Sequence, residues 1–458
     1  MQLFIYNSLT NKEDIFQPHN PDKITIYACG PTVYDYPHIG NARSAVVADM
    51  TYRVLSLIYN NITYVQNITD IDDKIINRAK ELNIHHKELA IKYEEIFKND
   101  IKWLKCKPPT EQPRATESLD DIIKTIQKLI DNGYAYITEQ NVYFSVNKYK
   151  NYGQLSGHDI NDQMHSTRIE AHDDKKNPHD FVLWKFDNKV YWDSPWGKGR
   201  PGWHIECTAM STKYLGETFD IHLGGMDLKF PHHENELTQG CCANLNSEYA
   251  RYWMHNGLLT INQAKMSKSV GNIITINKLK SDDWSAELIR YIYFMSHYRK
   301  PLDWNQNTIL EAKQVLIKFY KLIEGIESQD GELFQEFLQA LLNDFNTPYA
   351  ISIMHKMVDI LNKKYDKSIA GQLKMAGNLL GILEENPKEE IERILKSGLN
   401  LIDEEEVDRT IAARAVARKN KNFIKSDMIR DHLQTLNIEI SDKSDESGWF
   451  YKESIDIN

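Results

Sequence analysis

The stretch from residue 23 to residue 59 constrains the fold of this chain more than any other feature. Residues 23–29 (KITIYAC) are mainly β-branched and aromatic and run into Gly30-Pro31, which is typical of a buried strand followed by a loop. Residues 41–59 then carry apolar side chains at helical spacing. A strand, a glycine-containing turn and a helix form the first unit of a nucleotide-binding sheet, in which a phosphate favours the helix N-terminus.

The same pattern repeats downstream. Residues 62–68 predict a second strand and residues 74–82 a second helix, with the sequence TDIDD between them. Strands that alternate with helices indicate a parallel sheet. From about residue 117 to residue 201 the pattern changes to one helix and several short strands rich in Tyr and Trp. We interpret this segment as an insertion that divides the sheet into two halves.

We therefore expect an α/β fold: a split, doubly wound (Rossmann-like) parallel sheet with an inserted connective domain, followed by C-terminal α-helical domains. The expected boundaries are 1–116 for the first half of the sheet domain, 117–201 for the connective domain, 202–285 for the second half, 286–390 for a helical bundle and 391–458 for a C-terminal region.

Composition excludes several classes of protein. The chain has 458 residues, 41% of them hydrophobic, and a formal charge of −10. Polar residues interrupt residues 1–22, which lack the continuous apolar stretch of a signal peptide, and no apolar run approaches the roughly 20 residues that span a bilayer. Five cysteines in a chain of this length argue against a disulfide scaffold and for a reducing compartment. We expect a cytoplasmic protein that does not bind membranes and is a monomer.

The overall negative charge hides a basic segment near the C-terminus. Between residues 409 and 430 only Asp427 is acidic, which gives this segment the opposite sign from the whole chain. The segment is either a surface for nucleic acid or an ordinary solvated helical face. Its basic residues are Arg409, Arg414, Arg418, Lys419, Lys421, Lys425 and Arg430.

A candidate metal site lies in residues 230–236 (FPHHENE). Pro231 suits the first position of a helix, where its missing N–H has no cost. His232 and Glu236 are four residues apart and would share a face of that helix, as two ligands of one ion do. His233 and Glu236, three residues apart, would also serve, and spacing alone does not choose between the two histidines.

The remaining ligands would come from other segments. Cys29 ends the first strand, and Cys207 lies in the sequence GWHIEC. Two thiolates, an imidazole and a carboxylate suit zinc. The alternative is that these thiols are small buried side chains, which is the role we assign to Cys106, Cys241 and Cys242.

Two signatures, PHIGN at residues 37–41 and KMSKS at residues 265–269, occur in this order and resemble the ATP-handling signatures of class I aminoacyl-tRNA synthetases. With further segments they resemble one family over nearly the whole chain, the cysteinyl-tRNA synthetases of bacterial type. The further segments are residues 5–10, 27–35, 67–74, 113–117, 192–210, 220–236, 296–299 and 343–348.

The resemblance implies a ligase that activates L-cysteine with ATP and transfers it to tRNA(Cys). It implies one Zn²⁺, which favours the substrate thiolate over the hydroxyl of serine, and Mg²⁺ bound with ATP. It resolves the choice of histidine in favour of His232. The implied zinc ligands are Cys29, Cys207, His232 and Glu236.

The resemblance also implies the substrate-binding residues. The amino-acid pocket would contain Cys29, Thr69, Trp203, His222 and Asp227. The ATP site would contain His38, Gly40, Asn41, Lys265 and Lys268, with His38, Lys265 and Lys268 as the catalytic residues.

One residue departs from the class signature: Asn41 stands where a second histidine is usual. Asn41 can donate a hydrogen bond but cannot carry positive charge.

The resemblance also implies roles for the C-terminal domains. Residues 286–390 would contact the tRNA stem, and residues 391–458 would bind the anticodon.

Two other functions fit part of the pattern. A related ligase of the mycothiol pathway gives the same adenylate to an amino sugar, and a non-catalytic regulator could descend from a synthetase. The basic segment at 409–430 argues against the first, because that ligase has no tRNA to bind. The presence of Lys268 and of all the expected metal ligands argues against the second.

Overall fold

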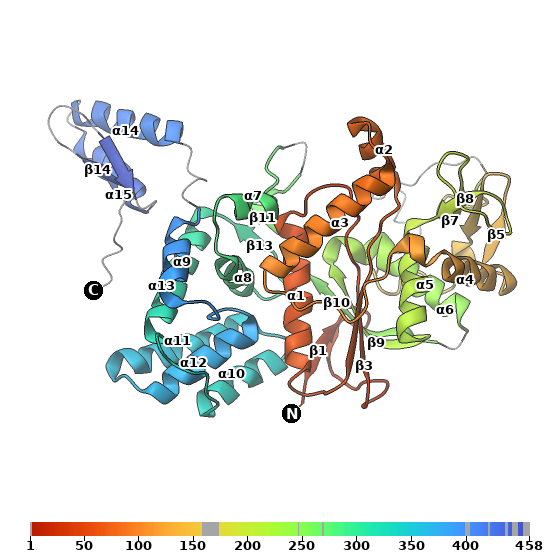
Figure 1. Cartoon of the computed structure of the whole chain (residues 1–458), viewed down its shortest axis with the longest axis horizontal. Coiled ribbons are helices and arrows are strands. Elements are labelled where there is room, and N and C mark those ends of the chain that lie inside the picture. The colour runs from red at the N-terminus through yellow and green to blue at the C-terminus, as the bar shows by residue number, and fades with distance from the viewer. Residues whose placement is uncertain are drawn as a thin grey trace.

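A central parallel sheet carries the fold. The structure is a computed structural model that describes residues 2–157, 174–245, 247–267, 270–398, 404–419, 422–435, 438–441 and 448–451. The sheet has the strand order β10-β9-β3-β4 and is visible at the centre of Figure 1. Its strands are β3 (Ile24–Ala28), β4 (Ile62–Gln66), β9 (Thr218–Gly225) and β10 (Tyr249–Asn256).

The order of the strands confirms the predicted split sheet. β3 pairs in parallel with β4, which follows it in sequence, and with β9, which comes after the insertion. Side chains of β3 alternate between two buried clusters, with Ile26 in one and Tyr27 in the other. The sheet is therefore covered on both faces, as is usual for a parallel sheet.

Helices from both halves cover this sheet. α1 contacts β4, β9 and β10, whereas α5 contacts β3, β4 and β9. The helices of the two halves are α1 (Ile39–Leu55), α2 (Asp73–Leu82), α3 (His86–Trp103), α5 (Trp203–Leu215) and α6 (Glu234–Ala243). A hairpin of β1 (Phe4–Asn7) and β2 (Lys12–Ile15) precedes them.

The inserted segment forms its own small antiparallel sheet with the order β5-β6-β7-β8. α4 packs on α5 and α6, so the insertion shares a buried cluster with the second half of the sheet domain. Its elements are α4 (Leu119–Asp131), β5 (Ala135–Ile137), β6 (Asn141–Phe144), β7 (Phe181–Phe186) and β8 (Gly199–Pro201).

A three-stranded sheet of order β12-β11-β13 follows the second half of the central sheet. Its strands are β11 (Leu259–Ile261), β12 (Ala264–Lys265) and β13 (Leu302–Trp304). The short helix α7 (Ile276–Ser281) lies between β12 and β13 in the sequence. The helical bundle consists of α8 (Ala286–Phe294), α9 (Gln306–Leu322), α10 (Glu332–Leu342), α11 (Thr347–Lys363), α12 (Lys367–Leu380) and α13 (Pro387–Lys396).

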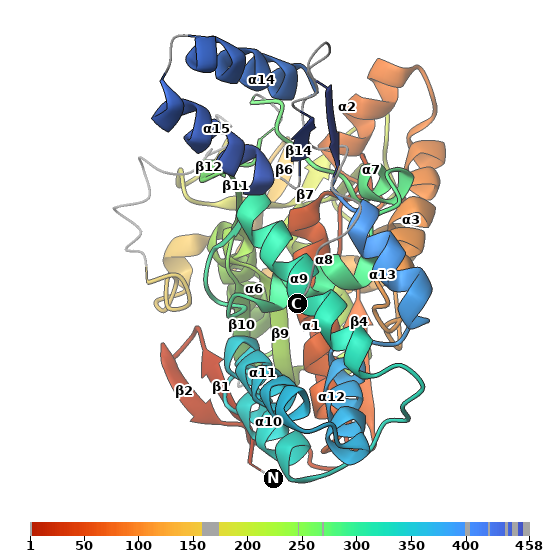
Figure 2. The ribbon, with the colours of Figure 1, turned by 90° about the vertical axis from the view of Figure 1, so that its left-hand side faces the viewer.

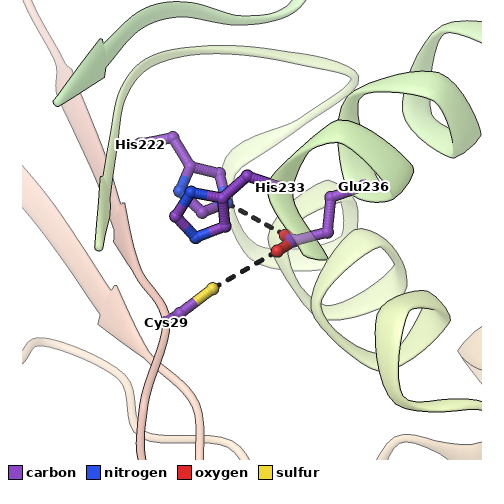
Figure 3. A group of neighbouring side chains, drawn as sticks. All are labelled: Cys29, His222, His233 and Glu236. Atoms are coloured by element: carbon purple, nitrogen blue, oxygen red, sulfur yellow. Dashed lines mark hydrogen bonds and ion pairs between the residues drawn. The ribbon is translucent and has the colours of Figure 1, made fainter. Parts of the chain in front are cut away.

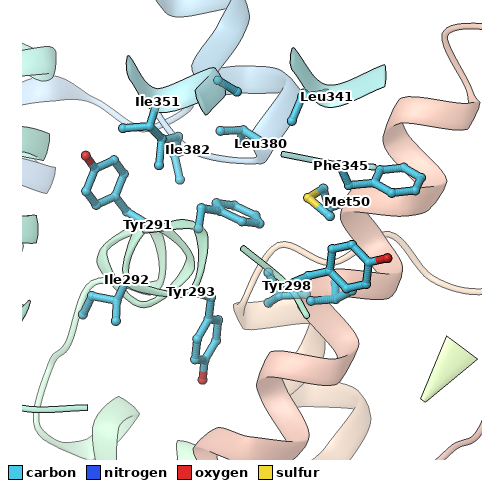
Figure 4. Packing of buried hydrophobic residues seen from close by; sticks show 14 of the residues in the cluster. Met50, Tyr291, Ile292, Tyr293, Tyr298, Leu341, Phe345, Ile351, Leu380 and Ile382 are labelled. Atoms are coloured by element: carbon cyan, nitrogen blue, oxygen red, sulfur yellow. The ribbon is translucent and has the colours of Figure 1, made fainter. Parts of the chain in front are cut away.

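One hydrophobic cluster runs from the central sheet through α1 into the bundle. Met50 of α1, Tyr291 of α8 and Leu341 of α10 belong to it, and Figure 4 shows them in one packed group. The bundle is therefore anchored on the helix that begins at the first signature.

The C-terminal part contains α14 (Glu404–Lys419), α15 (Phe423–Thr435) and an unpredicted hairpin of β14 (Ile438–Ser441) and β15 (Gly448–Tyr451). α14 and α15 pack on one another and lie at one end of the molecule, as the second view also shows (Figure 2). Arg414 is buried, whereas Arg418 and Lys425 are exposed. Among the described residues, no helix is long and apolar enough to cross a membrane.

Candidate active site

A cleft of about 680 Å³ opens at the carboxyl ends of β3 and β9. These neighbouring strands come from the two halves of the sheet, and ligands of doubly wound sheets bind at such a point. The cleft brings together most of the residues that the sequence predicted for the site. Those that line it are Cys29, His38, Gly40, Asn41, Thr69, Trp203, Cys207, Asp227, His232 and Lys265.

The first signature caps α1 at one end of the cleft. His38 Nδ1 accepts hydrogen bonds from the backbone N–H groups of Gly40 at 3.1 Å and Asn41 at 3.2 Å. The Asn41 side-chain oxygen accepts from the backbone N–H of His38 at 3.1 Å. Because Nδ1 is an acceptor, the neutral His38 ring carries its hydrogen on Nε2, which makes Nε2 a donor.

A side chain at position 40 would crowd this cap. A Cβ atom at this position would lie 3.0 Å from two atoms of the His38 ring and 3.3 Å from Cε of Met266. Met266 belongs to the second signature, so the two signatures meet at Gly40.

Backbone hydrogen bonds hold the segment after the second signature beside the first. The Ile39 N–H donates to the Ile274 carbonyl at 3.0 Å, and the Ile276 N–H donates to the Pro37 carbonyl at 2.9 Å. Lys265 lies on β12 with an exposed side chain and lines the cleft. Lys268 lies outside the described residues.

A cluster of possible metal ligands lies at the other end of the cleft. One ligand atom from each of Cys29, Cys207, His232 and Glu236 lies within 4.8 Å of all the others. The Cys29 sulfur is 3.9 Å from the Cys207 sulfur and 3.3 Å from Glu236 Oε1. His232 Nε2 is 3.0 Å from the same carboxylate oxygen.

The local fold explains how His232 and Glu236 meet. Phe230 is extended (φ −140°, ψ 133°). After it the chain is helical through His233 and into α6. The two side chains four residues apart therefore lie on one face. The other histidine, His233, has its Nδ1 2.8 Å from His255 Nε2.

A second group of four possible ligands overlaps the first. Cys29, His222, His233 and Glu236 also offer atoms within 4.8 Å of one another. Figure 3 shows the Glu236 carboxylate between the Cys29 sulfur and the His222 ring, whose Nε2 is 2.9 Å from Glu236 Oε2. This second group contains only one thiol, whereas the first contains two, and two thiolates make the softer set.

The charges of the cluster favour metal ligation. A hydrogen bond from the Cys29 thiol, together with His232, lowers the pKa of Cys207 to about 6 against the effect of burial. Burial would raise the pKa of Glu236, but His222 and His232 hold it well below its usual range. A thiolate and a carboxylate at neutral pH are the forms that bind a metal.

The remaining residues predicted for the amino-acid pocket differ in exposure. Thr69 is buried and its hydroxyl accepts from Asn67 Nδ2 at 3.2 Å. The Trp203 ring stacks on His232 with centroids 4.2 Å apart. Asp227 is exposed in the turn after β9, whereas His222 is fully buried against Glu236.

Three further residues of this region carry no mark in the sequence. His204 Nδ1 lies 2.8 Å from His232 Nδ1. Lys74 lines the cleft beside Trp203, and Arg43 on α1 donates to the carbonyls of Gly257 at 2.7 Å and Leu258 at 2.9 Å. Each lies within a segment that the resemblance covers or adjoins, but residue type alone does not mark any of them as functional.

Comparison with known proteins gives the class. The family described as the tRNA synthetases class I (C) catalytic domain matches residues 15–314, and the DALR domain family matches residues 336–385. The fold is similar to Mycobacterium tuberculosis methionyl-tRNA synthetase in complex with methionyl-adenylate, with a TM-score of 0.56 and 10% identity over 81% of this chain and 91% of that chain. Fold, cleft and family match together define a class I aminoacyl-tRNA synthetase.

Sequence relatives narrow the class to one family. The cysteine–tRNA ligase of Wolbachia pipientis subsp. Culex pipiens (strain wPip) is 45% identical over 98% of this chain and 97% of its own length. The cysteine–tRNA ligase of Ehrlichia canis (strain Jake) is 45% identical over 98% of this chain and 100% of its own length. The chain belongs to the cysteine–tRNA ligase family, whose members are enzymes that form AMP and pyrophosphate.

Proposed function

We propose that this chain activates L-cysteine with ATP to form cysteinyl-adenylate and then transfers the cysteinyl group to the 3′-terminal ribose of tRNA(Cys). One observation carries the proposal: the His38 cap, Lys265 and the cysteine-containing cluster lie in a single cleft. The names of the relatives, cysteine–tRNA ligases, support the choice of cysteine and of tRNA.

In the activation step, a carboxylate oxygen of cysteine forms a bond to the α-phosphorus of ATP. The bond from that phosphorus to the pyrophosphate oxygen breaks, and the pyrophosphate leaves with the electron pair. The attacking carboxylate is already ionised, so this step needs no general base.

Residues at the nucleotide end of the cleft support this step. His38 donates from Nε2 to a phosphate at the N-terminus of α1, where the helix dipole also favours negative charge. Gly40 and Asn41 belong to the same ATP site. Lys265 and Lys268 neutralise the charge that develops on the departing pyrophosphate. Mg²⁺ would bind together with ATP.

In the transfer step, a hydroxyl oxygen of the terminal ribose forms an ester bond to the cysteinyl carbonyl carbon. The bond to the phosphate oxygen of the adenylate breaks, AMP leaves with the electron pair, and the hydroxyl proton passes to solvent.

Cys29, Cys207, His232 and Glu236 would hold one Zn²⁺ per chain. Support comes from the closeness of their donor atoms and from the lowered pKa of Cys207. The bound zinc would supply a Lewis acid that prefers a thiolate to a hydroxyl, and would thereby favour cysteine over serine.

The amino-acid pocket would use residues of the same cleft. Asp227 would bind the substrate α-ammonium group, and Thr69 and Trp203 would form walls of the pocket. His222 would act through its contact with Glu236.

The proposed domains are residues 1–116 and 202–285 for the two halves of the sheet domain, 117–201 for the connective domain, 286–390 for the helical bundle and 391–458 for the C-terminal region. Residues 286–390 would contact the tRNA stem and residues 391–458 the anticodon. The proposed form is a monomer in the cytoplasm, where its five free cysteines stay reduced.

Isotope exchange between pyrophosphate and ATP tests the activation step directly. We expect exchange with L-cysteine, and none above background with L-serine or without an amino acid. Exchange that does not depend on the amino acid, or that is equal for serine and cysteine, would refute the proposal. Charging of tRNA(Cys) by the same preparation tests the transfer step.

A further inference from the structure

Lys74 occupies a position that the proposed function leaves unexplained. A second cavity, of about 460 Å³, lies beside the active-site cleft and reaches the strands of the connective insertion. Lys74 and Trp203 line both cavities, so these two side chains form part of the boundary between them.

Aromatic rings hold the Lys74 ammonium at this boundary. Its Nζ lies 5.7 Å from the centroid of the Tyr34 ring and 5.9 Å from that of the Trp203 ring. Both distances are within the range in which a cation is attracted to an aromatic face. An ammonium placed in this way keeps its hydrogen-bond donors available to a ligand in the cleft.

The neighbouring carboxylates are engaged elsewhere. Asp72 caps α2 by accepting from the backbone N–H of Lys74 at 2.7 Å. Asp73 contacts Lys185 Nζ at 2.9 Å and also pairs with Arg200. Within the described part of the chain, no carboxylate oxygen lies within 4.0 Å of the Lys74 Nζ atom.

Trp203 connects the boundary between the two cavities with the cluster of possible metal ligands. The Trp203 ring that Lys74 approaches also stacks on His232, with ring centroids 4.2 Å apart. In L-cysteine only Cβ and Cα separate the sulfur from the carboxyl carbon. A cysteine whose sulfur lies at the cluster therefore has its carboxylate within the same part of the cleft, which Lys74 and Asp227 both line.

We propose that Lys74 binds the α-carboxylate of the substrate cysteine and positions it for the activation step. The ammonium meets the carboxylate oxygen that does not attack ATP, which leaves the other oxygen directed at the α-phosphorus. Asp227 and Lys74 then recognise the two charges of the amino acid. This inference rests on the proposed function, because it assumes that cysteine binds in this cleft.

The test compares cysteine with L-cysteinol, in which a hydroxymethyl group replaces the carboxylate. Calorimetry measures the dissociation constants of both ligands for the zinc-loaded full-length protein, without tRNA. The variants are Lys74→Met, which removes the charge, Lys74→Arg, which keeps it, and Lys80→Met as the matched control. Lys80 lies on the same helix, with an exposed side chain near its other end.

We expect Lys74→Met to weaken cysteine binding by about 10- to 100-fold, as loss of a hydrogen bond to a charged group does. Cysteinol binding should change by less than about 2-fold, since it lacks the carboxylate. Lys74→Arg should keep more of the affinity for cysteine than Lys74→Met, and Lys80→Met should bind both ligands as the wild type does.

Three results would overturn the inference. Equal weakening of cysteine and cysteinol would show that Lys74 acts only by supporting Trp203. Unchanged binding of both would show that the ammonium does not meet the amino acid. Unchanged cysteine binding with a raised KM for tRNA would assign Lys74 to a tRNA phosphate. Failure of the proposed function itself is distinguishable, because the wild-type protein would then show no cysteine-dependent exchange.

Discussion

Cys207 is the residue whose environment says most about the chemistry of the cleft. Its side chain is buried, and burial normally raises the pKa of a thiol. The Cys29 thiol and His232 outweigh burial and bring the pKa of Cys207 to about 6. At neutral pH the Cys207 thiolate and the Glu236 carboxylate are both negative and repel one another. A divalent cation bound between them would remove this repulsion, because both groups would then be its ligands.

We predict that Cys207→Ser lowers zinc content from one ion per chain towards zero. Affinity for cysteine should fall by about 100-fold or more, since even residues that only orient a ligand are worth 10- to 100-fold. ATP binding should stay close to the wild-type value, because the proposed ATP site lies at the other end of the cleft. Metal analysis and calorimetry measure both effects.

Cys241→Ser is the matched control for this substitution. Cys241 lies on α6 but outside both groups of possible ligands, and burial raises the pKa of its thiol to about 11. A Cys207→Ser protein that keeps full zinc and still prefers cysteine to serine would contradict the assignment.

Single residues of the site differ in how far the sequence could predict them. Helical spacing paired Glu236 with either His232 or His233, and only the resemblance to a known family chose His232. The contact of His204 with His232 and the place of Lys74 between two rings depend on how α5, α2 and the loop after β3 pack. Such packing has no periodic signal in the sequence, so these residues became visible only in three dimensions.

At the scale of elements, α1 connects the parts of the active site with the bundle. Near the start of α1, Arg43 donates to the carbonyls of Gly257 and Leu258, which lie directly before β11. Further along the helix, Asp49 accepts a hydrogen bond from Arg290 of α8 at 2.6 Å. Apolar spacing predicted this helix. The polar contacts join residues more than 200 positions apart, which spacing does not report.

Long elements with a strong period were predicted best, whereas short strands were not. The sequence analysis did not foresee the β14–β15 hairpin or the sheet of β11, β12 and β13. These strands span two to four residues each, too few for an alternating pattern to stand out.

α9 offers a test of how burial of a charge affects the bundle. Lys313 is buried, donates to the Leu395 carbonyl of α13 at 3.1 Å, and has a pKa lowered by burial from 10.5 to about 8. Between pH 8 and 10.5 the unfolded chain binds more protons here than the folded protein. The free energy of unfolding therefore rises with pH across this window, and below pH 8 the cost of burial is constant.

We predict that Lys313→Met is more stable than the wild type at pH 7. Removing the buried charge should raise the free energy of unfolding by up to about 3 kcal/mol, and losing the hydrogen bond should lower it by about 1 kcal/mol. This advantage should shrink as pH rises towards 10.5 and level off above it, where the wild-type lysine becomes neutral in both states. Urea unfolding at pH 7 and pH 10 measures the difference. Lys321→Met, at an exposed position of the same helix, should show no such dependence, and an equal difference at both pH values for Lys313→Met would contradict the argument.

At the scale of the whole molecule, the cleft and the C-terminal part are built from separate segments. The residues that line the cleft come from positions 28 to 275, and α13 is fixed to α8 by the Ser285 N–H, which donates to Ser397 Oγ at 2.9 Å. Beyond residue 398, α14 packs on α15, and exposed basic side chains including Arg418, Lys419 and Lys425 lie on these helices. Activation of cysteine and contact with tRNA should therefore be separable by truncation.

We predict that a protein ending at Gly398 keeps cysteine-dependent pyrophosphate exchange close to the wild-type rate but charges tRNA(Cys) poorly. Gly398 packs against Trp284, so this end point keeps the α13 contact intact. In the full-length protein, replacing Arg418, Lys419 and Lys425 with Gln should weaken tRNA binding. It should also reduce the slope of affinity against salt concentration, because fewer counterions are released from phosphates. If the truncated protein charges tRNA as well as the full-length one, and the triple variant keeps the wild-type salt dependence, the basic residues form only a solvated surface.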